Sequence, residues 1–161
     1  MTVARPLADR LERTVNGPMW HGPALRELLG DVSYEAAAAR PIAGAHSIWE
    51  LVVHISAWAD IARARLAATP APTVTPDEDW PPVGDPTPAR WAADVARLGE
   101  SYRELASAVA MLEDRSLAEV VPGRDYSRID MVHGVIEHGT YHGGQIALLK
   151  RALGTRPNLR V

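Results

Sequence analysis

The chain has 161 residues, of which 47% are hydrophobic and 23% are charged, a composition typical of one globular domain and not of a disordered chain. It contains no cysteine, which excludes disulfides, thiolate metal sites, iron–sulfur clusters and cysteine nucleophiles. A net charge of −3 argues against a protein that binds nucleic acid or an anionic membrane surface.

The distribution of apolar residues argues against a membrane protein. No apolar run approaches the roughly 20 residues that a membrane span needs, and the N-terminus lacks the apolar run of a signal peptide. Together with the missing cysteines, this predicts a cytoplasmic protein, which we treat as a single domain over 1–161. Phenylalanine is absent and tryptophan occurs five times, so we expect tryptophan to supply most of the large aromatic packing.

The first 46 residues carry only weak helical patterns. We expect helices over 5–15 and 22–30, because Gly17-Pro18 interrupts the pattern between them. Residues 31–46 are predicted to be mostly loop or a short turn.

The next segments carry the clearest helical periodicity. Residues 47–68 and 88–112 repeat apolar side chains at three- and four-residue steps, which predicts two amphipathic helices. Ser47 and Glu50 have the spacing of a capping box at the start of the first. Thr87 is expected to cap the second, with Pro88 as its first helical residue.

The connection over 69–87 contains six prolines, so we expect neither a helix nor a central strand there. Nineteen residues at up to about 3.3 Å each are enough to cross a helix of roughly 30 Å from end to end. The second and third helices of the bundle are therefore expected to run parallel, joined by a long crossover. The sequence leaves the handedness of the bundle open.

The last predicted helix spans about 128–153, after a non-helical stretch over 113–127, and Gly154 stands where a left-handed C-cap would end it. No long stretch alternates apolar and polar residues as a β-strand with one buried face would. The predicted fold is therefore all-α, a four-helix bundle with a long proline-rich crossover between the second and third helices.

Histidines on two of these helices are candidates for a metal site. His138 and His142 are four residues apart on the apolar face of the last helix, so both rings should point into the bundle and could share one ion. His133 falls about 170° from the centre of that face and should point away. His54 lies near the edge of the apolar face of 47–68. The alternative is that these histidines only fill core or surface positions.

The common catalytic motifs are absent from the sequence. There is no His-Glu-x-x-His run, no Glu-x-x-His pair of the di-iron bundles, no phosphate-binding or dinucleotide glycine motif, and no serine in a nucleophile elbow. A three-histidine site inside a bundle is the candidate that remains.

Two segments, HSIWELVVHISAW over 46–58 and GVIEHGTYHGGQIALLKRAL over 134–153, resemble the DinB-like superfamily of four-helix-bundle proteins. The resemblance runs from about Trp20 to Leu153 and includes the loop Glu78-Asp79-Trp80-Pro81. It implies that His54, His138 and His142 bind one divalent metal ion. Zinc, nickel and iron all accept such a ligand set.

The resemblance also implies a class of reaction. Some members are metal-dependent transferases or isomerases that use low-molecular-weight thiols such as bacillithiol or mycothiol. The leading interpretation is therefore a thiol S-transferase, or a related detoxification enzyme, acting on a small-molecule substrate. The nucleophilic sulfur would come from a co-substrate, because the chain has no cysteine. The alternatives are a non-catalytic metal-binding or small-molecule-binding bundle, acting as a sensor or scaffold, and a plain structural bundle without metal.

Weaker candidates surround the histidines. Glu50 could orient His54 or act as a base, although its capping role already explains it. Trp58 is expected to wall the pocket or fill the core, and Gln145 to contact His142 or link helices. His21 is a minor candidate.

Two further expectations concern close packing and assembly. Gly139, Gly143 and Gly144 each cost roughly 1 kcal/mol of helix propensity, which suggests a close helix contact or room beside a metal. An apolar stripe left exposed on the bundle would support a homodimer, as some relatives form.

Overall fold

The computed structural model describes residues 2–67 and 71–154, and these fold into helices joined by loops. Two isolated β-bridges, Met19 with Gly22 and Val120 with Ser127, are the β-pairing found in this described part, which has no strand. The prediction of an all-α fold is confirmed. The long helices are α1 (Ala4–Asn16), α4 (Ile48–Ala67), α6 (Pro88–Ala110) and α8 (Arg128–Ala152).

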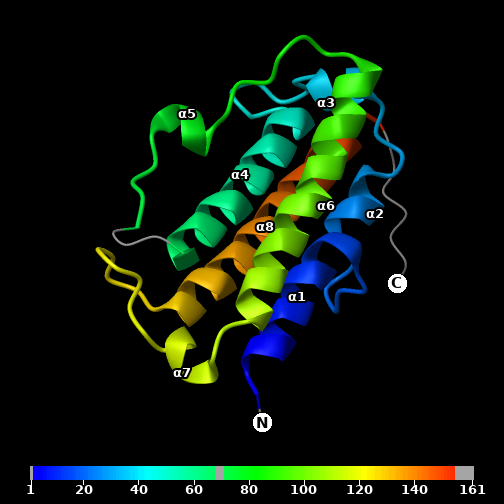
Figure 1. The fold of residues 1–161 in the computed structure, drawn as a ribbon. Coiled ribbons are helices and arrows are strands. Elements are labelled where there is room, and N and C mark those ends of the chain that lie inside the picture. Colours follow the sequence, from blue (N-terminus) through cyan, green and yellow to red (C-terminus); the bar gives the residue numbers. More distant parts are fainter. Residues whose placement is uncertain (1, 68–70, 155–161) are drawn as a thin grey trace.

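The four long helices pack side by side (Figure 1). The contacting pairs are α1 with α6, α6 with α4, α4 with α8, and α8 with α1, so each helix has two long neighbours. The helices α4 and α6 run in one direction and α1 and α8 in the other. The parallel course expected of α4 and α6 is therefore present, and the chain between them returns along the outside of α4.

Short helices occupy the connections: α2 (Leu25–Leu29), α3 (Tyr34–Ala38), α5 (Pro76–Asp79) and α7 (Asp114–Leu117). The helix expected over 22–30 is thus shorter than predicted. The segments expected to be loops at 31–46 and 113–127 each contain about one helical turn. Such short turns carry too few residues for apolar periodicity to reveal them.

The expectation that 69–87 contains no helix is wrong at α5. Thr75 caps this turn, because its backbone N–H donates to Glu78 Oε2 at 2.8 Å and its hydroxyl accepts from the Glu78 backbone N–H. Pro76 occupies the first helical position, where a missing N–H removes no hydrogen bond. Proline therefore allows this turn instead of excluding it. Residues 68–70 of the same connection lie outside the described residues.

The core lies where the four long helices meet. Side chains with almost no exposed surface come from all four of them, among them Leu11, Trp49, Ile55, Leu98, Tyr102 and Ile146. Burying each aliphatic side chain contributes roughly 1.5–3 kcal/mol to folding, which makes the core the main source of stability.

The tryptophans divide between core and surface. Trp49 and Trp91 are buried with ring centroids 5.2 Å apart, whereas Trp20 is fully exposed. Trp58 and Trp80 are only half-buried and lie at the site described below. Two of the five tryptophans, Trp49 and Trp91, therefore supply aromatic packing in the core as expected.

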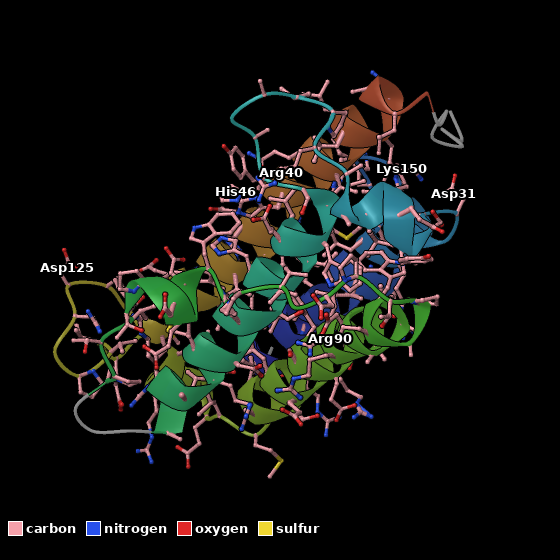
Figure 2. All side chains as sticks on the ribbon, turned by 90° about the horizontal axis from the view of Figure 1, so that it is seen from above. Asp31, Arg40, His46, Arg90, Asp125 and Lys150 are labelled. Carbon is pink, nitrogen blue, oxygen red and sulfur yellow. The ribbon has the colours of Figure 1, made fainter. Side chains whose placement is uncertain are left out.

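The single lysine of the chain fastens α8 to the end of α2. Lys150 is 2% exposed, its ammonium donates to the Leu28 carbonyl at 2.6 Å, and it pairs with Asp31 (Figure 2). A buried ammonium is tolerated only with such partners. The pair holds the C-terminal half of α8 against the loop that follows α2.

Candidate metal centre

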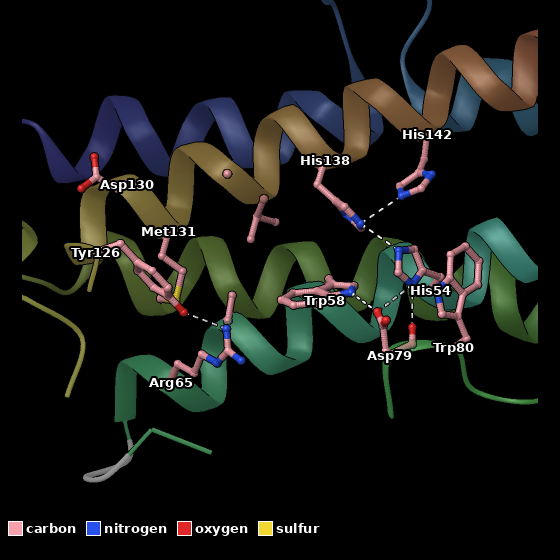
Figure 3. Close-up of a pocket in the computed structure, with 13 residues that line it drawn as sticks. His54, Trp58, Arg65, Asp79, Trp80, Tyr126, Asp130, Met131, His138 and His142 are labelled. Atoms are coloured by element: carbon pink, nitrogen blue, oxygen red, sulfur yellow. Dashed lines mark hydrogen bonds and ion pairs between the residues drawn. The ribbon is translucent and has the colours of Figure 1, made fainter. Parts of the chain in front are cut away.

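Three histidines lie together between α4 and α8 (Figure 3). Nε2 of His138 lies 2.9 Å from Nε2 of His54 and 3.0 Å from Nε2 of His142. One ligand nitrogen of each ring lies within 4.8 Å of those of the other two. His54 and His142 are 5% and 6% exposed, and His138 is half-buried. The expected convergence is present, whereas metal ligation stays a prediction.

Helical geometry explains which histidines meet. His138 and His142 are one turn apart on α8 and share the face that packs against α4. His133 lies on the same helix but is exposed, as its position on the helical wheel predicted. His54 reaches the same point from α4.

Hydrogen bonds to oxygen atoms orient two of the rings. Nδ1 of His54 donates to the backbone carbonyl of Asp79 at 2.5 Å, and Nδ1 of His142 donates to Oε1 of Gln145 at 2.6 Å. Because a carbonyl oxygen can only accept, each Nδ1 carries the proton and each Nε2 presents a lone pair to the centre. This is the tautomer that a histidine ligand needs.

His138 lacks such a partner. Its Nδ1 is buried without a hydrogen-bond acceptor among the residues that the structure describes, and its Nε2 faces the lone pairs of both other rings. One proton on this Nε2 could serve only one of the two neighbours. A cation could instead accept all three lone pairs, and nitrogens that share an ion at about 2.1 Å lie no more than about 4.2 Å apart. Both Nε2 separations from His138 meet that limit, and the ligand nitrogens of all three rings lie within 4.8 Å of one another. Three neutral imidazole nitrogens are also a donor set that divalent metal ions accept.

The electrostatics of the site favour neutral rings. Burial lowers the pKa of His54 and of His142 below the usual value. Burial also lowers the pKa of His138, to about 3, and the charges that His142 and His54 would carry add to the effect. Neutral imidazole is the form that binds a metal, so all three rings are ready as ligands at pH 7.

The short helix α5, which apolar periodicity does not reveal, closes the site from the side of α4. The Asp79 carboxylate accepts from Trp58 Nε1 at 2.7 Å and lies 3.4 Å from His54 Nδ1. The Trp80 ring stacks on His54, with centroids 3.8 Å apart, and on His46 on its other side, at 3.6 Å. The one signal that could have found these residues is the Glu78-Asp79-Trp80-Pro81 segment of the family resemblance.

The weaker candidates fall in different places. Gln145 contacts His142, and Trp58 lines the pocket beside His54 and His138. The Glu50 carboxylate accepts from the Ser47 backbone N–H at 2.7 Å and pairs with Arg40, so it serves the helix start. His21 is exposed and lines a separate small cavity of about 140 Å³.

A pocket of about 720 Å³ runs between α4 and α8, with the three histidines at one end. Its middle is walled by Trp58, Ala62, Met131, Gly134 and Val135. Arg65, Tyr126 and Asp130 line the other end, and the sequence analysis singled out none of these three. The volume of this pocket and its apolar walls suit a small organic molecule.

The comparison with protein families identifies the chain. A family model described as the DinB superfamily matches residues 20–146, which include all three histidines. The chain belongs to the DinB superfamily. The matched range of this DinB-superfamily protein also contains α5, Arg65, Tyr126 and Asp130, which helical periodicity did not reveal as parts of the pocket.

Two other comparisons and a search for membrane spans complete the findings. Neither the curated proteins nor the solved structures contain a significant match to this DinB-superfamily chain. Among the residues described, no helix combines the length and the apolar character needed to cross a membrane.

Proposed function

We propose that this DinB-superfamily protein is a metal-dependent enzyme that transfers a low-molecular-weight thiol to a small electrophilic substrate, with His54, His138 and His142 as the metal ligands. The observation that carries the proposal is the meeting of three Nε2 atoms at one end of a pocket of about 720 Å³. Such a pocket holds an organic molecule beside the histidines.

A divalent ion such as zinc, nickel or iron, held by three neutral imidazoles, would supply a positive charge that lowers the pKa of an incoming thiol. The thiol comes from a co-substrate, because the protein has no cysteine. In the transfer, the sulfur forms a bond to the electrophilic carbon, the leaving group departs with its electron pair, and the thiol proton passes to solvent.

The residues around the histidines have supporting roles in this proposal. The Asp79 carbonyl and the Gln145 amide oxygen hold two rings with Nε2 facing the centre. Trp80 covers His54 and Trp58 walls the adjacent pocket, so both exclude water from one side of the site. Low water content strengthens the electrostatic stabilisation of a developing charge.

The test is metal analysis of protein purified without an affinity tag, followed by a screen of thiols against electrophiles. We expect about one equivalent of a divalent metal and thiol-dependent turnover that chelation removes. A His54→Ala variant should lose both, whereas His133→Ala, which removes an exposed histidine of α8, should keep both. Turnover that survives complete chelation would refute the proposal.

A non-catalytic metal-binding or small-molecule-binding bundle is the second candidate, and one observation favours it. The two carboxylates that line the pocket each accept hydrogen bonds from a neighbouring residue, Asp79 from Trp58 and Asp130 from Ser127, and neither has a geometry that marks it as a general base. Bound metal without turnover in the same screen would support this candidate over the transferase.

The homodimer also stays a prediction. Tyr141 and Leu148 are 65% and 57% exposed and lie seven residues apart, on one outward face of α8. Light scattering coupled to gel filtration should then give twice the chain mass. A cytoplasmic location and the absence of nucleic-acid binding remain expectations from the sequence.

A further inference from the structure

The end of the pocket opposite the histidines contains a buried arginine. Arg65 is 7% exposed, its Nη1 donates to the Tyr126 hydroxyl at 2.8 Å, and its guanidinium carbon lies 5.5 Å from the centroid of the Trp58 ring (Figure 3). Within residues 2–67 and 71–154, its buried Nε has no hydrogen-bond acceptor. Arginine keeps its charge under all ordinary conditions, so a full positive charge lies in this pocket.

No carboxylate in the described part of the chain forms an ion pair with Arg65. Asp130 also lines the pocket, but its carboxylate accepts from the backbone N–H and the hydroxyl of Ser127 at the start of α8. Buried charges in proteins are normally paired, because an unpaired charge loses its hydration without compensation. The guanidinium of Arg65 therefore brings to the pocket a positive charge that no carboxylate of the described residues compensates.

The distance between the two ends sets the length of a ligand. Arg65 follows His54 by eleven residues on α4, which places it about 20° away around the helix and about 16 Å further along it. Both side chains therefore line the same pocket from the same helix face. The walls between them are apolar, from Trp58 and Ala62 on α4 and from Met131 and Val135 on α8.

We propose that this pocket binds an elongated organic anion, with its carboxylate on Arg65 and Tyr126 and its apolar body between α4 and α8. The free guanidinium N–H groups suit a planar carboxylate, which can accept two of them at once. That the far end of this ligand reaches the histidines rests on the proposed function. The anion site itself depends only on Arg65 and its surroundings.

The probe for this site is decanoate, whose chain fits the apolar section, with decyltrimethylammonium as a ligand of equal chain length and opposite charge. Titration calorimetry on the full-length protein, as purified and after chelation, should show that decanoate binds and that the cation binds at least about tenfold more weakly. Equal binding of both would overturn the proposal, because the pocket would then recognise only the alkyl chain.

Substitutions at Arg65 test where in the pocket the carboxylate of decanoate binds. Arg65→Met keeps an apolar side chain and removes the charge, so it should weaken the binding of decanoate at least about tenfold. Arg65→Lys keeps the charge but loses the planar guanidinium, so it should weaken this binding less. Arg63→Met is the matched control, because Arg63 lies on the same helix but is exposed and pairs with Glu104. It should bind decanoate like the unchanged protein.

A second variant covers the case in which Arg65→Met does not fold. Tyr126→Phe removes one hydroxyl at the same end of the pocket and should weaken decanoate several-fold. Unchanged decanoate binding in both Arg65→Lys and Tyr126→Phe would overturn the proposal. Binding that chelation abolishes and that Arg65 variants leave unchanged would also overturn it, because the carboxylate would then sit on the metal.

These measurements separate the two proposals. Loss of all thiol transfer with Arg65-dependent decanoate binding intact would refute the proposed function alone. Thiol transfer without Arg65-dependent binding would refute the anion site alone.

Discussion

His138 is the residue that most clearly distinguishes the site from ordinary core packing. Its two histidine neighbours have fixed tautomers, and its own buried Nδ1 has no acceptor. A core residue without a role would rarely keep a buried polar atom without a partner. A cation shared by the three Nε2 atoms would account for their lone pairs facing one another, with the proton of His138 on Nδ1.

The first prediction concerns the stability of the metal-free protein at acid pH. Because burial lowers the pKa of the three histidines in the folded state, the unfolded chain takes up their protons first, below about pH 6.5. The stabilising contribution is therefore complete above pH 6.5 and is lost as the pH falls toward the folded value, about 3 for His138. Where His138 is protonated in the unfolded chain and neutral in the folded protein, it adds a slope of up to roughly 1.4 kcal/mol per pH unit.

Urea unfolding of chelated protein between pH 5 and 6.5 measures this slope. His138→Gln should reduce the dependence of the unfolding free energy on pH by about the contribution of one histidine. The exposed control His133→Gln should leave this dependence unchanged. An identical slope in all three proteins would contradict the buried, neutral state of His138.

The second prediction concerns turnover. Under the proposed function, His142→Ala removes a metal ligand and should lower the rate at pH 7 by more than about tenfold. Part of the rate should return toward pH 8.5, where a free thiol ionises without help. A pH–rate profile with the thiol in excess measures this.

Glu50→Ala serves as the comparison for that profile. It removes a cap and the pair with Arg40, so it should cost on the order of 1 kcal/mol of stability with the profile unchanged. An equal loss of activity from Glu50→Ala and from His142→Ala would indicate that Glu50 takes part in catalysis.

At the scale of the elements, α8 combines the site with a close approach to α1 and α6 at Gly139. A Cβ added at Gly139 would lie 2.5 Å from the Tyr102 hydroxyl on α6 and 2.8 Å from Cγ2 of Thr14 on α1. Tyr102 is itself held, since its hydroxyl donates to the Val135 carbonyl at 3.2 Å. Glycine is therefore needed at 139 for the helices to approach, which confirms the expected close contact at Gly139. At Gly144 the described residues leave the added Cβ in open space, so the same expectation is wrong there.

The third prediction compares two glycines of this helix. Gly139→Ala should destabilise the protein by roughly 1–3 kcal/mol, because the clash outweighs the gain in helix propensity. At Gly144 nothing lies within 4 Å of the added Cβ, so Gly144→Ala should stabilise by up to about 1 kcal/mol. Chemical denaturation of both variants measures the difference. Equal effects at the two positions would contradict the close approach at Gly139.

At the scale of the whole molecule, the candidate centre joins α4 to α8, and α5 is held to it through Asp79 and Trp80. A metal ion on the three histidines would therefore cross-link segments far apart in the chain. Any ligand that binds only the folded state stabilises it, by about 2.7 kcal/mol at a free concentration of one hundred times Kd.

The fourth prediction follows from this linkage. Adding zinc or nickel to chelated protein should raise the melting temperature by several degrees. His54→Ala should abolish the rise, and His133→Ala should keep it, because His133 is exposed on the far side of α8. Differential scanning calorimetry measures the shift without reference to activity, and an equal rise in both variants would contradict binding at the three histidines.

The sequence alone determined the long helices and the histidines that meet. The predicted segments 47–68, 88–112 and 128–153 differ from α4, α6 and α8 by no more than two residues at any end. Periodicity and caps are local properties, and a four-residue spacing on one helix is enough to place His138 and His142 on one face.

The tertiary structure decided what surrounds those histidines. Asp79 reaches His54 across 25 residues of chain, and Arg65 reaches Tyr126 across 61, so neither contact leaves a periodic trace in the sequence. A proline-rich connection gives no sign of which face of the bundle its single helical turn will cover. Long-range packing brings Trp80 onto His54, because the connection that contains α5 folds against α4. It also leaves the charge of Arg65 inside an apolar pocket, because α8 packs against the same face of α4.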